Sequence, residues 1–253
     1  MPVTLKKLLE HCDSELEVAR FRDYCPNGLQ VEGRPQVQRL AAAVTANQSV
    51  LDEAVAWGAD ALLVHHGYFW RGEAQPVVGM KRRRLLTLLA NDMSLLAYHL
   101  PLDAHALLGN NAQFGRLLGI DEHHPLDASD LDTVGNIGSL AEAERLGDLV
   151  GRVAAITGRE PLLIGDPERE VQHIGWCTGA AQGYLDKALA AGAELYISGE
   201  ISEPTVHAAR EQGIAYLAAG HHATERYGVQ ALAGSLADRF GLDWCFVDCD
   251  NPV

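Results

Sequence analysis

The sequence contains no apolar run close to the ~20 residues that a membrane-spanning helix requires. Residues 1–20, MPVTLKKLLEHCDSELEVAR, have the pattern of an amphipathic helix. They lack the apolar stretch and the cleavage site of a signal peptide. We therefore expect a cytoplasmic protein with no membrane segment.

Basic residues are also scarce, because 20 lysines and arginines stand against 34 acidic residues, for a formal net charge of −14. Proteins that bind nucleic acid through its phosphates usually carry a basic face. The one basic cluster, KRRR at 81–84, leads directly into the apolar run LLTLLA and is typical of a solvated helix start. We therefore expect no nucleic-acid partner.

The five cysteines form no CxxC pair, and their number is odd. In a cytosolic chain they are expected to be reduced and structural, and Cys245 and Cys249 do not have a zinc-site spacing. The sequence also lacks a GxxxxGK[ST] phosphate loop, a GxSxG elbow and a GxGxxG fingerprint. Thiolate metal sites, P-loop chemistry and dinucleotide binding are therefore not predicted.

The chain does contain a regular alternation of strand-like apolar runs and helical patterns. Strands are predicted at 37–46, 61–66 and 94–100, with helices between and after them, at 49–58, 81–92 and around 110–120. Such an alternation indicates an α/β protein with a largely parallel sheet.

The second half of the sequence resembles the first. VTANQSVLDEAVAWGADALLVHH aligns with CTGAAQGYLDKALAAGAELYISGE, so that Gly58 meets Gly192 and Asp60 meets Glu194. Further on, the strand that ends at His99 aligns with the strand that ends at Gly220 and His221. We predict an internal duplication, with a first repeat at 1–120, an insertion at 121–172 and a second repeat at 173–253. The insertion begins polar and turn-rich, and LGDLVGRVAAITGREPLLIGD, which follows, is typical of a helix and a short strand.

Imidazoles and carboxylates gather where predicted strands end. His65 and His66 end the strand at 61–66, and His99 ends the next one, with Asp103 four residues later. In the second repeat, Glu200 follows the strand YIS, and His221, His222 and Glu225 follow a later strand in GHHATE. Ligands in parallel α/β sheets bind at the carboxyl ends of strands, so these side chains are expected to form a site.

Adjacent side chains of a regular strand point to opposite faces, so His65 and His66 cannot both face one site from within a strand. We expect Gly67 to free the backbone past the strand end, where both rings turn into one crevice. In GHHATE, a helix would stack His221 on Glu225 (i, i+4) or His222 on Glu225 (i, i+3), and the residues alone do not choose between them.

Mixed imidazole and carboxylate donors suit zinc, iron, manganese or nickel, and carboxylates can bridge two ions. Isolated histidines are usually surface groups or satisfied core groups. We assign the remaining six to that class: His11, His105, His123, His124, His173 and His207.

Several motifs in one order resemble a known family. They are DYCPNGLQVEG, VHHGYFW, HLPLDAH followed by GNNAQ, WCTGAAQ, SGE and GHHATE. This set is similar to the Ngg-interacting-factor-three-like family, in particular to its bacterial YbgI-like branch, which is catalogued as GTP cyclohydrolase I type 2 homologs. The resemblance spans nearly the whole chain and is weakest at 121–172.

The resemblance implies a three-layer α/β/α fold of two similar, intertwined domains with a dinuclear metal centre. It also implies a toroidal homohexamer built as a trimer of dimers. Carried over by position, the metal ligands fall on His65, His66, Asp103, His221 and Glu225. The choice of His221 over His222 rests on this resemblance alone.

The leading hypothesis is a metal-dependent hydrolase that holds two divalent ions and acts on a nucleotide-like or other small phosphorylated substrate. GTP cyclohydrolase activity is the specific reaction that the resemblance names. His99 and Glu200 are candidates for proton transfer because they adjoin the predicted ligands. The alternative is a non-enzymatic protein that binds or delivers metal, or a regulatory assembly. A ring that threads nucleic acid is disfavoured by the acidic charge balance.

Overall fold

The computed structural model describes residues 2–129 and 134–253 and divides the chain into two compact units. The first unit comprises residues 1–109 and 228–250, and the second comprises 110–227 and 251–253. Among the described residues, no helix combines the length and the apolar character that crossing a bilayer requires.

The first unit is built on a five-stranded sheet of order β13-β4-β5-β6-β2. Strands β13, β4, β5 and β6 run parallel, and β2 pairs with β6 in the antiparallel sense. The strands span Gly28–Val31 (β2), Arg39–Thr45 (β4), Ala61–His66 (β5), Ser94–Ala97 (β6) and Asp243–Phe246 (β13).

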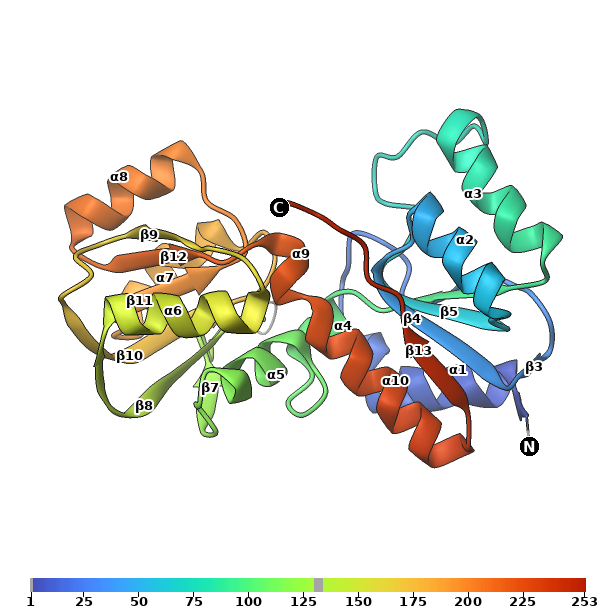
Figure 1. Ribbon diagram of the computed structural model, residues 1–253, viewed down its shortest axis with the longest axis horizontal. Coiled ribbons are helices and arrows are strands. Elements are labelled where there is room, and N and C mark those ends of the chain that lie inside the picture. Colours follow the sequence, from blue (N-terminus) through green and yellow to red (C-terminus); the bar gives the residue numbers. More distant parts are fainter. Residues whose placement is uncertain (1, 130–133) are drawn as a thin grey trace. The chain divides into compact units, whose positions relative to one another are not determined.

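Helices cover both faces of this sheet. On β4, Leu40 and Ala42 face a core with helices α1 (Leu5–Glu15) and α10 (Arg226–Phe240). Ala41 and Ala43 face the opposite core, under helices α2 (Gln48–Trp57) and α3 (Gly79–Ala90). Because alternate residues of a strand point to opposite faces, a nearly continuous apolar run supplies both cores. The first unit is therefore a three-layer α/β/α structure (Figure 1).

The second unit is built on a six-stranded sheet of order β7-β8-β10-β11-β12-β9. Strands β10, β11 and β12 are parallel, and β8 and β9 border them in the antiparallel sense. The strands span His123–Pro125 (β7), Asn136–Arg145 (β8), Leu162–Ile164 (β9), Glu170–Cys177 (β10), Leu195–Ser198 (β11) and Ala215–Ala218 (β12).

This second sheet also carries helices on two faces. Ile174 and Trp176 of β10 pack with helices α5 (Asn110–Leu117) and α6 (Leu146–Thr157). Gly175 points the other way, towards Ala188 of α7 (Leu185–Ala190), and α8 (Glu203–Gln212) packs against β12. The remaining short elements are β1 (Val3–Thr4), η1 (Val18–Arg20), β3 (Gln36–Val37), α4 (Leu100–Ala104), η2 (Gln182–Tyr184) and α9 (His221–Thr224).

The predicted α/β class is thus confirmed, and the two units are interwoven along the chain. The first sheet is largely parallel as expected, whereas the second is mixed, because β7, β8 and β9 join its three parallel strands through antiparallel pairings. The polypeptide leaves the first unit after Gly109 and returns to it through α10 and β13.

Both units contain the sequence strand–helix–strand–helix–strand, β4-α2-β5-α3-β6 and β10-α7-β11-α8-β12, with the same strand order. Gly58 and Gly192 follow the first helix of each unit with positive φ angles of 79° and 89°. The carboxylates of Asp60 and Glu194, two residues later, each accept hydrogen bonds from two consecutive backbone amides. This likeness is compatible with the predicted duplication, whose repeat boundaries stay a prediction.

The helix and the short strand predicted in the later part of the insertion are present as α6 and β9, whereas its polar and turn-rich start leads into two strands that were not predicted. Strand β8 pairs with β10 in a register that sets Asn136 opposite Trp176, and β7 pairs with β8. Much of β8 is exposed, so its sequence lacks the apolar pattern by which buried strands are recognised. Residues 130–133 of this segment lie outside the described residues.

Candidate metal centre

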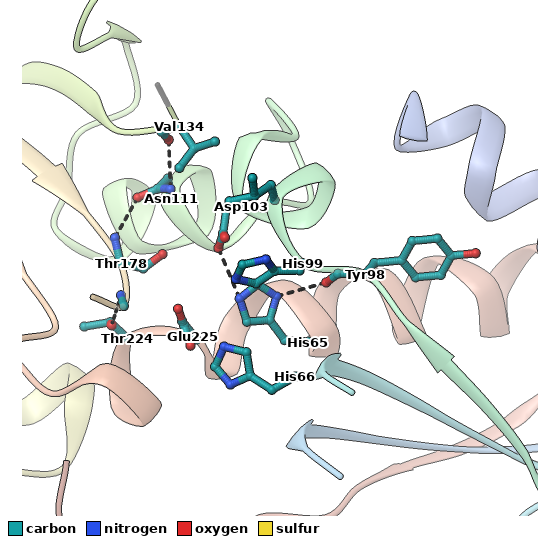
Figure 2. Close-up of polar contacts among 12 residues, drawn as sticks. His65, His66, Tyr98, His99, Asp103, Asn111, Val134, Thr178, Thr224 and Glu225 are labelled. Carbon is teal, nitrogen blue, oxygen red and sulfur yellow. Dashed lines mark hydrogen bonds and ion pairs between the residues drawn. The ribbon is translucent and has the colours of Figure 1, made fainter. Parts of the chain in front are cut away.

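In the first unit, strand β5 ends in the two adjacent histidines. His65 is fully buried, and its Nδ1 lies 2.9 Å from the carbonyl oxygen of Tyr98. Because a carbonyl only accepts hydrogen bonds, Nδ1 carries the proton, and in the neutral ring Nε2 carries the lone pair. That Nε2 lies 3.5 Å from a carboxylate oxygen of Asp103. Figure 2 shows Tyr98 and Asp103 at the two nitrogens of the His65 ring.

His66 is the last residue of the same strand, so the expectation that both rings turn inwards only past the strand end is wrong. Its Nδ1 lies 3.2 Å from the hydroxyl of Thr45, its register partner on β4. The centroids of the His65 and His66 rings are nevertheless 4.5 Å apart. The two side chains converge within the strand, at its last pleat.

Gly67 follows this pair for a reason other than the one predicted. It is absent from the residues of positive φ in the described chain, so no left-handed turn requires a glycine there. A Cβ atom at Gly67 would instead collide with the side-chain amide of Gln30 and lie 2.7 Å from Cβ of Ala97. The glycine permits the close approach of β2 to the strand end.

His99 and Asp103 come from the next strand end and from helix α4. Pro101 lies in the first turn of this helix, a position that tolerates proline because its missing N–H has no intrahelical partner. The helix places Asp103, which is 5% exposed, one turn after His99. The ring of His99 has its centroid 5.1 Å from that of His65 and 5.8 Å from that of His66.

Asp23 is part of this site and was missed by the sequence analysis. One of its carboxylate oxygens lies 2.7 Å from Nδ1 of His99, and its side chain is 3% exposed. Burial alone would raise the pKa of Asp23, but the hydrogen bond and the charge of His99 outweigh it and lower the pKa to about 2. No spacing or periodicity in the sequence marks Asp23, because it precedes a turn and belongs to neither a helix nor a strand.

The three histidines of the first unit form a set that could hold a metal ion. One ring nitrogen from each of His65, His66 and His99 lies within 4.8 Å of the other two. Three imidazoles are a donor set that suits zinc and other first-row metals.

In the second unit, His221 begins helix α9 and Glu225 directly follows its last residue. Nε2 of His221 lies 3.1 Å from one carboxylate oxygen of Glu225, so the i, i+4 spacing brings the pair together. Nδ1 of His221 lies 2.7 Å from Glu200, which follows strand β11. His221 is thus held between two carboxylates.

The electrostatics of this pair favour a cation. Burial lowers the pKa of His221, but Glu225 and Glu200 outweigh it and raise the pKa to about 9. The same negative field that stabilises a proton on the ring would stabilise a divalent ion beside it.

Small residues keep the surroundings of Glu225 tightly packed. A Cβ atom at Gly179 would collide with the Glu225 carboxylate, and the Gly179 amide donates to the hydroxyl of Thr224 over 3.1 Å. Asn111 fixes the backbone next to Gly179. Its side chain accepts a hydrogen bond from the Thr178 amide and donates one to the Val134 carbonyl, each over 2.9 Å (Figure 2).

His222, the alternative partner of Glu225, is 7% exposed, and its backbone amide donates to the carbonyl of Val253. Three histidines assigned to structural roles have local contacts. His11 packs edge-on against Phe240, His105 accepts from two following amides, and His207 pairs with Glu203 one helical turn away.

The model of the Duf34/NIF3 (NGG1p interacting factor 3) family matches residues 3–252. The chain belongs to this family. A Pseudomonas aeruginosa relative named GTP cyclohydrolase 1 type 2 homolog is 56% identical over 253 residues, which is all of both chains. An Escherichia coli K12 relative of the same name is 49% identical over 242 residues, 95% of this chain and 96% of its own.

The fold of this Duf34/NIF3 member is also similar to a solved structure. The structure of the protein ybgI, of unknown function, superposes with a TM-score of 0.94 at 47% identity, covering 99% of this chain and 100% of its own. The resemblance drawn from the sequence motifs is therefore confirmed.

Proposed function

We propose that the protein binds two divalent metal ions through His65, His66, Asp103, His221 and Glu225. The observation that carries this proposal is the convergence of His65 and His66 in the first unit, where one ring nitrogen of each lies within 4.8 Å of the other. Two further observations support it: the Asp103 carboxylate beside Nε2 of His65, and the i, i+4 pair of His221 and Glu225. The donors fit zinc, iron, manganese or nickel, because they are imidazoles and carboxylates without a thiolate set.

The proposed activity is hydrolysis of a nucleotide-like or other small phosphorylated substrate. When bound, a pair of divalent ions would supply Lewis-acid chemistry that polarises the attacked group and acidifies water. The printed name of the relatives, GTP cyclohydrolase 1 type 2 homolog, makes GTP the first substrate to test.

His99 and Glu200 are proposed to move protons in this reaction. Each is partly accessible, with 15% and 34% of its side chain exposed, and each adjoins a proposed ligand. The hydrogen bond from Nδ1 of His99 to Asp23 leaves Nε2 of a neutral ring as the proton-accepting atom.

We further propose that the protein acts in the cytoplasm as a toroidal homohexamer, a trimer of dimers. The support is the motif resemblance together with the whole-length match to bacterial relatives. Native mass spectrometry should then record a mass six times that of one chain, and a monomer would contradict this assembly.

The function is tested by turnover on a panel of GTP, other nucleotides and phosphoesters with metal-loaded protein. The wild type is expected to turn over at least one member, and Asp103→Ala to lose at least 100-fold in rate as well as bound metal, measured by inductively coupled plasma mass spectrometry. His207→Ala, which removes an exposed histidine, is the matched control and should behave like the wild type.

Full metal content with no turnover across the panel would contradict the hydrolase and favour the alternative, a protein that binds or delivers metal. In that case metal should pass from the loaded protein to a chelator or an acceptor protein at the same rate in His99→Ala and in the wild type.

A further inference from the structure

The carboxylate of Asp23 is buried in the first unit and accepts four hydrogen bonds. Its Oδ1 lies 2.7 Å from Nδ1 of His99 and accepts from the Tyr24 amide. Its Oδ2 accepts from the Leu100 amide over 3.0 Å and from the side chain of Asn27 over 2.9 Å. These bonds place one carboxylate at the start of helix α4 and behind the ring of His99.

We propose that Asp23 is a positioning residue that holds His99 in the tautomer with the proton on Nδ1, so that Nε2 is the atom presented to substrate. This inference rests on the proposed function, in which His99 moves a proton. A carboxylate with four donors around it is an acceptor only, so the hydrogen between Asp23 and His99 belongs to the imidazole.

The backbone around His99 is fixed by the same group of residues. The His99 amide donates to the side-chain oxygen of Asn27 over 2.7 Å, while Asn27 in turn donates to Asp23. The ring also packs edge-on against Trp70, with centroids 5.0 Å apart. A flip of the ring would move Nδ1 away from Asp23 and break this hydrogen bond.

The orientation of the His99 ring matters because two of the proposed metal ligands, His65 and His66, lie next to it. The rings of His65 and His66 have their centroids 5.1 Å and 5.8 Å from that of His99. With Nδ1 committed to Asp23, the lone pair of His99 lies on Nε2, the nitrogen across the ring from Asp23. A proton accepted there would leave an imidazolium that the Asp23 carboxylate stabilises, which is the role of the aspartate in a Ser-His-Asp triad.

The second unit contains the same pairing independently. Glu200 lies 2.7 Å from Nδ1 of His221, and the repeat alignment brings the strand end near His99 into correspondence with the one at Gly220 and His221. A carboxylate thus stands behind the Nδ1 atom of the strand-end histidine in both units. Such carboxylate–imidazole pairs fix the tautomer and ring orientation of histidines at metal and catalytic sites.

The test is the tautomer of His99, read by nuclear magnetic resonance on protein labelled with ¹⁵N at histidine and stripped of metal. The His99 signals are assigned as those lost in His99→Gln. In the wild type, the proton is expected on Nδ1. In Asp23→Asn, the amide can donate to Nδ1, and the proton is expected to move to Nε2.

Asp23→Glu keeps the acceptor and should restore the Nδ1–H tautomer at least in part. Glu203→Gln changes an exposed carboxylate paired with a different histidine, His207, and should leave the His99 signals unchanged. Two results would overturn the proposal: an Nε2–H tautomer in the wild type, or an Nδ1–H tautomer that persists in Asp23→Asn. The first of these needs no variant and holds even if Asp23→Asn fails to fold.

Addition of zinc to the same wild-type sample separates this inference from the proposed function. Nitrogen shifts of His65, His66 and His221 that do not respond to zinc would refute the metal centre while the tautomer result for Asp23 stands. Responsive ligand signals with an unchanged His99 tautomer in Asp23→Asn would refute the role of Asp23 alone.

Discussion

At the scale of single residues, the site depends on atoms that are fixed before any ligand binds. The Tyr98 carbonyl sets the tautomer of His65, and the close approach of Gln30 to Gly67 fixes the strand end that carries it. Gln30 accepts from the Tyr68 amide over 2.6 Å and donates to the carbonyls of Pro26 and Tyr68. This glutamine therefore ties the turn after the histidine pair to strand β2.

Gly67→Ala is expected to lower the free energy of unfolding by about 1–3 kcal/mol, because the added methyl group must displace Gln30 or the strand end. Urea unfolding followed by circular dichroism measures this change. Gly151→Ala is the matched control, since a methyl group at this position in helix α6 meets no atom within 4 Å and should be neutral or slightly stabilising. Equal stability of the Gly67→Ala variant and the wild type would contradict the close-approach explanation.

At the scale of elements, each unit has a carboxylate between its first helix and its second strand that binds backbone amides of the first strand or of the residue before it. These carboxylates are Asp60, which is buried, and Glu194, which is half-buried. In the second unit, Glu194 accepts from the amides of Gln172 and His173 over 2.7 Å and 3.0 Å. These backbone donors hold the pKa of Glu194 below its usual value of 4.5. A lowered pKa means that the charged form stabilises the fold above pH 4.5, and that this stability is lost as the pH falls through the lower, folded value.

Glu194→Gln is expected to lower the free energy of unfolding by about 1 kcal/mol at neutral pH, because the amide accepts the same bonds without the charge. The difference from the wild type should shrink as the pH drops below 4.5, where the wild-type carboxylate is itself progressively protonated. Chemical unfolding at a series of pH values measures it. A difference that stays constant down to pH 2 would show that the charge of Glu194 has no part in stability.

Some strands and site residues could be predicted from the sequence alone, and others could not. Buried parallel strands such as β5 carry unbroken apolar runs, so their ends, and therefore His65 and His66, could be predicted. Strand β8 could not, because its pairing with β10 rather than its own side chains makes it a strand. Asp23 could not be predicted either, since its contact with His99 joins residues 76 positions apart through a turn without periodicity.

At the scale of the whole molecule, the chain path determines how the first unit closes. Helix α10 supplies Val229, Leu232 and Leu236 to the core that also contains Leu8 of α1. The first unit therefore completes its core only after the second unit has been synthesised. The alternation of strands and helices predicted the α/β class, and the motif resemblance implied the three layers. The return of the chain to the first unit depends on long-range packing that no local sequence pattern records.

The central claim is that one chain holds two divalent ions through two imidazole–carboxylate sets, one contributed by each unit. Titration of chelator-treated protein with zinc, followed by isothermal calorimetry and metal analysis after desalting, tests it directly. We expect the wild type to retain two equivalents per chain, and Asp103→Ala and His221→Ala each to retain fewer. Retention of less than one equivalent by the wild type, or of two by both variants, would contradict the account.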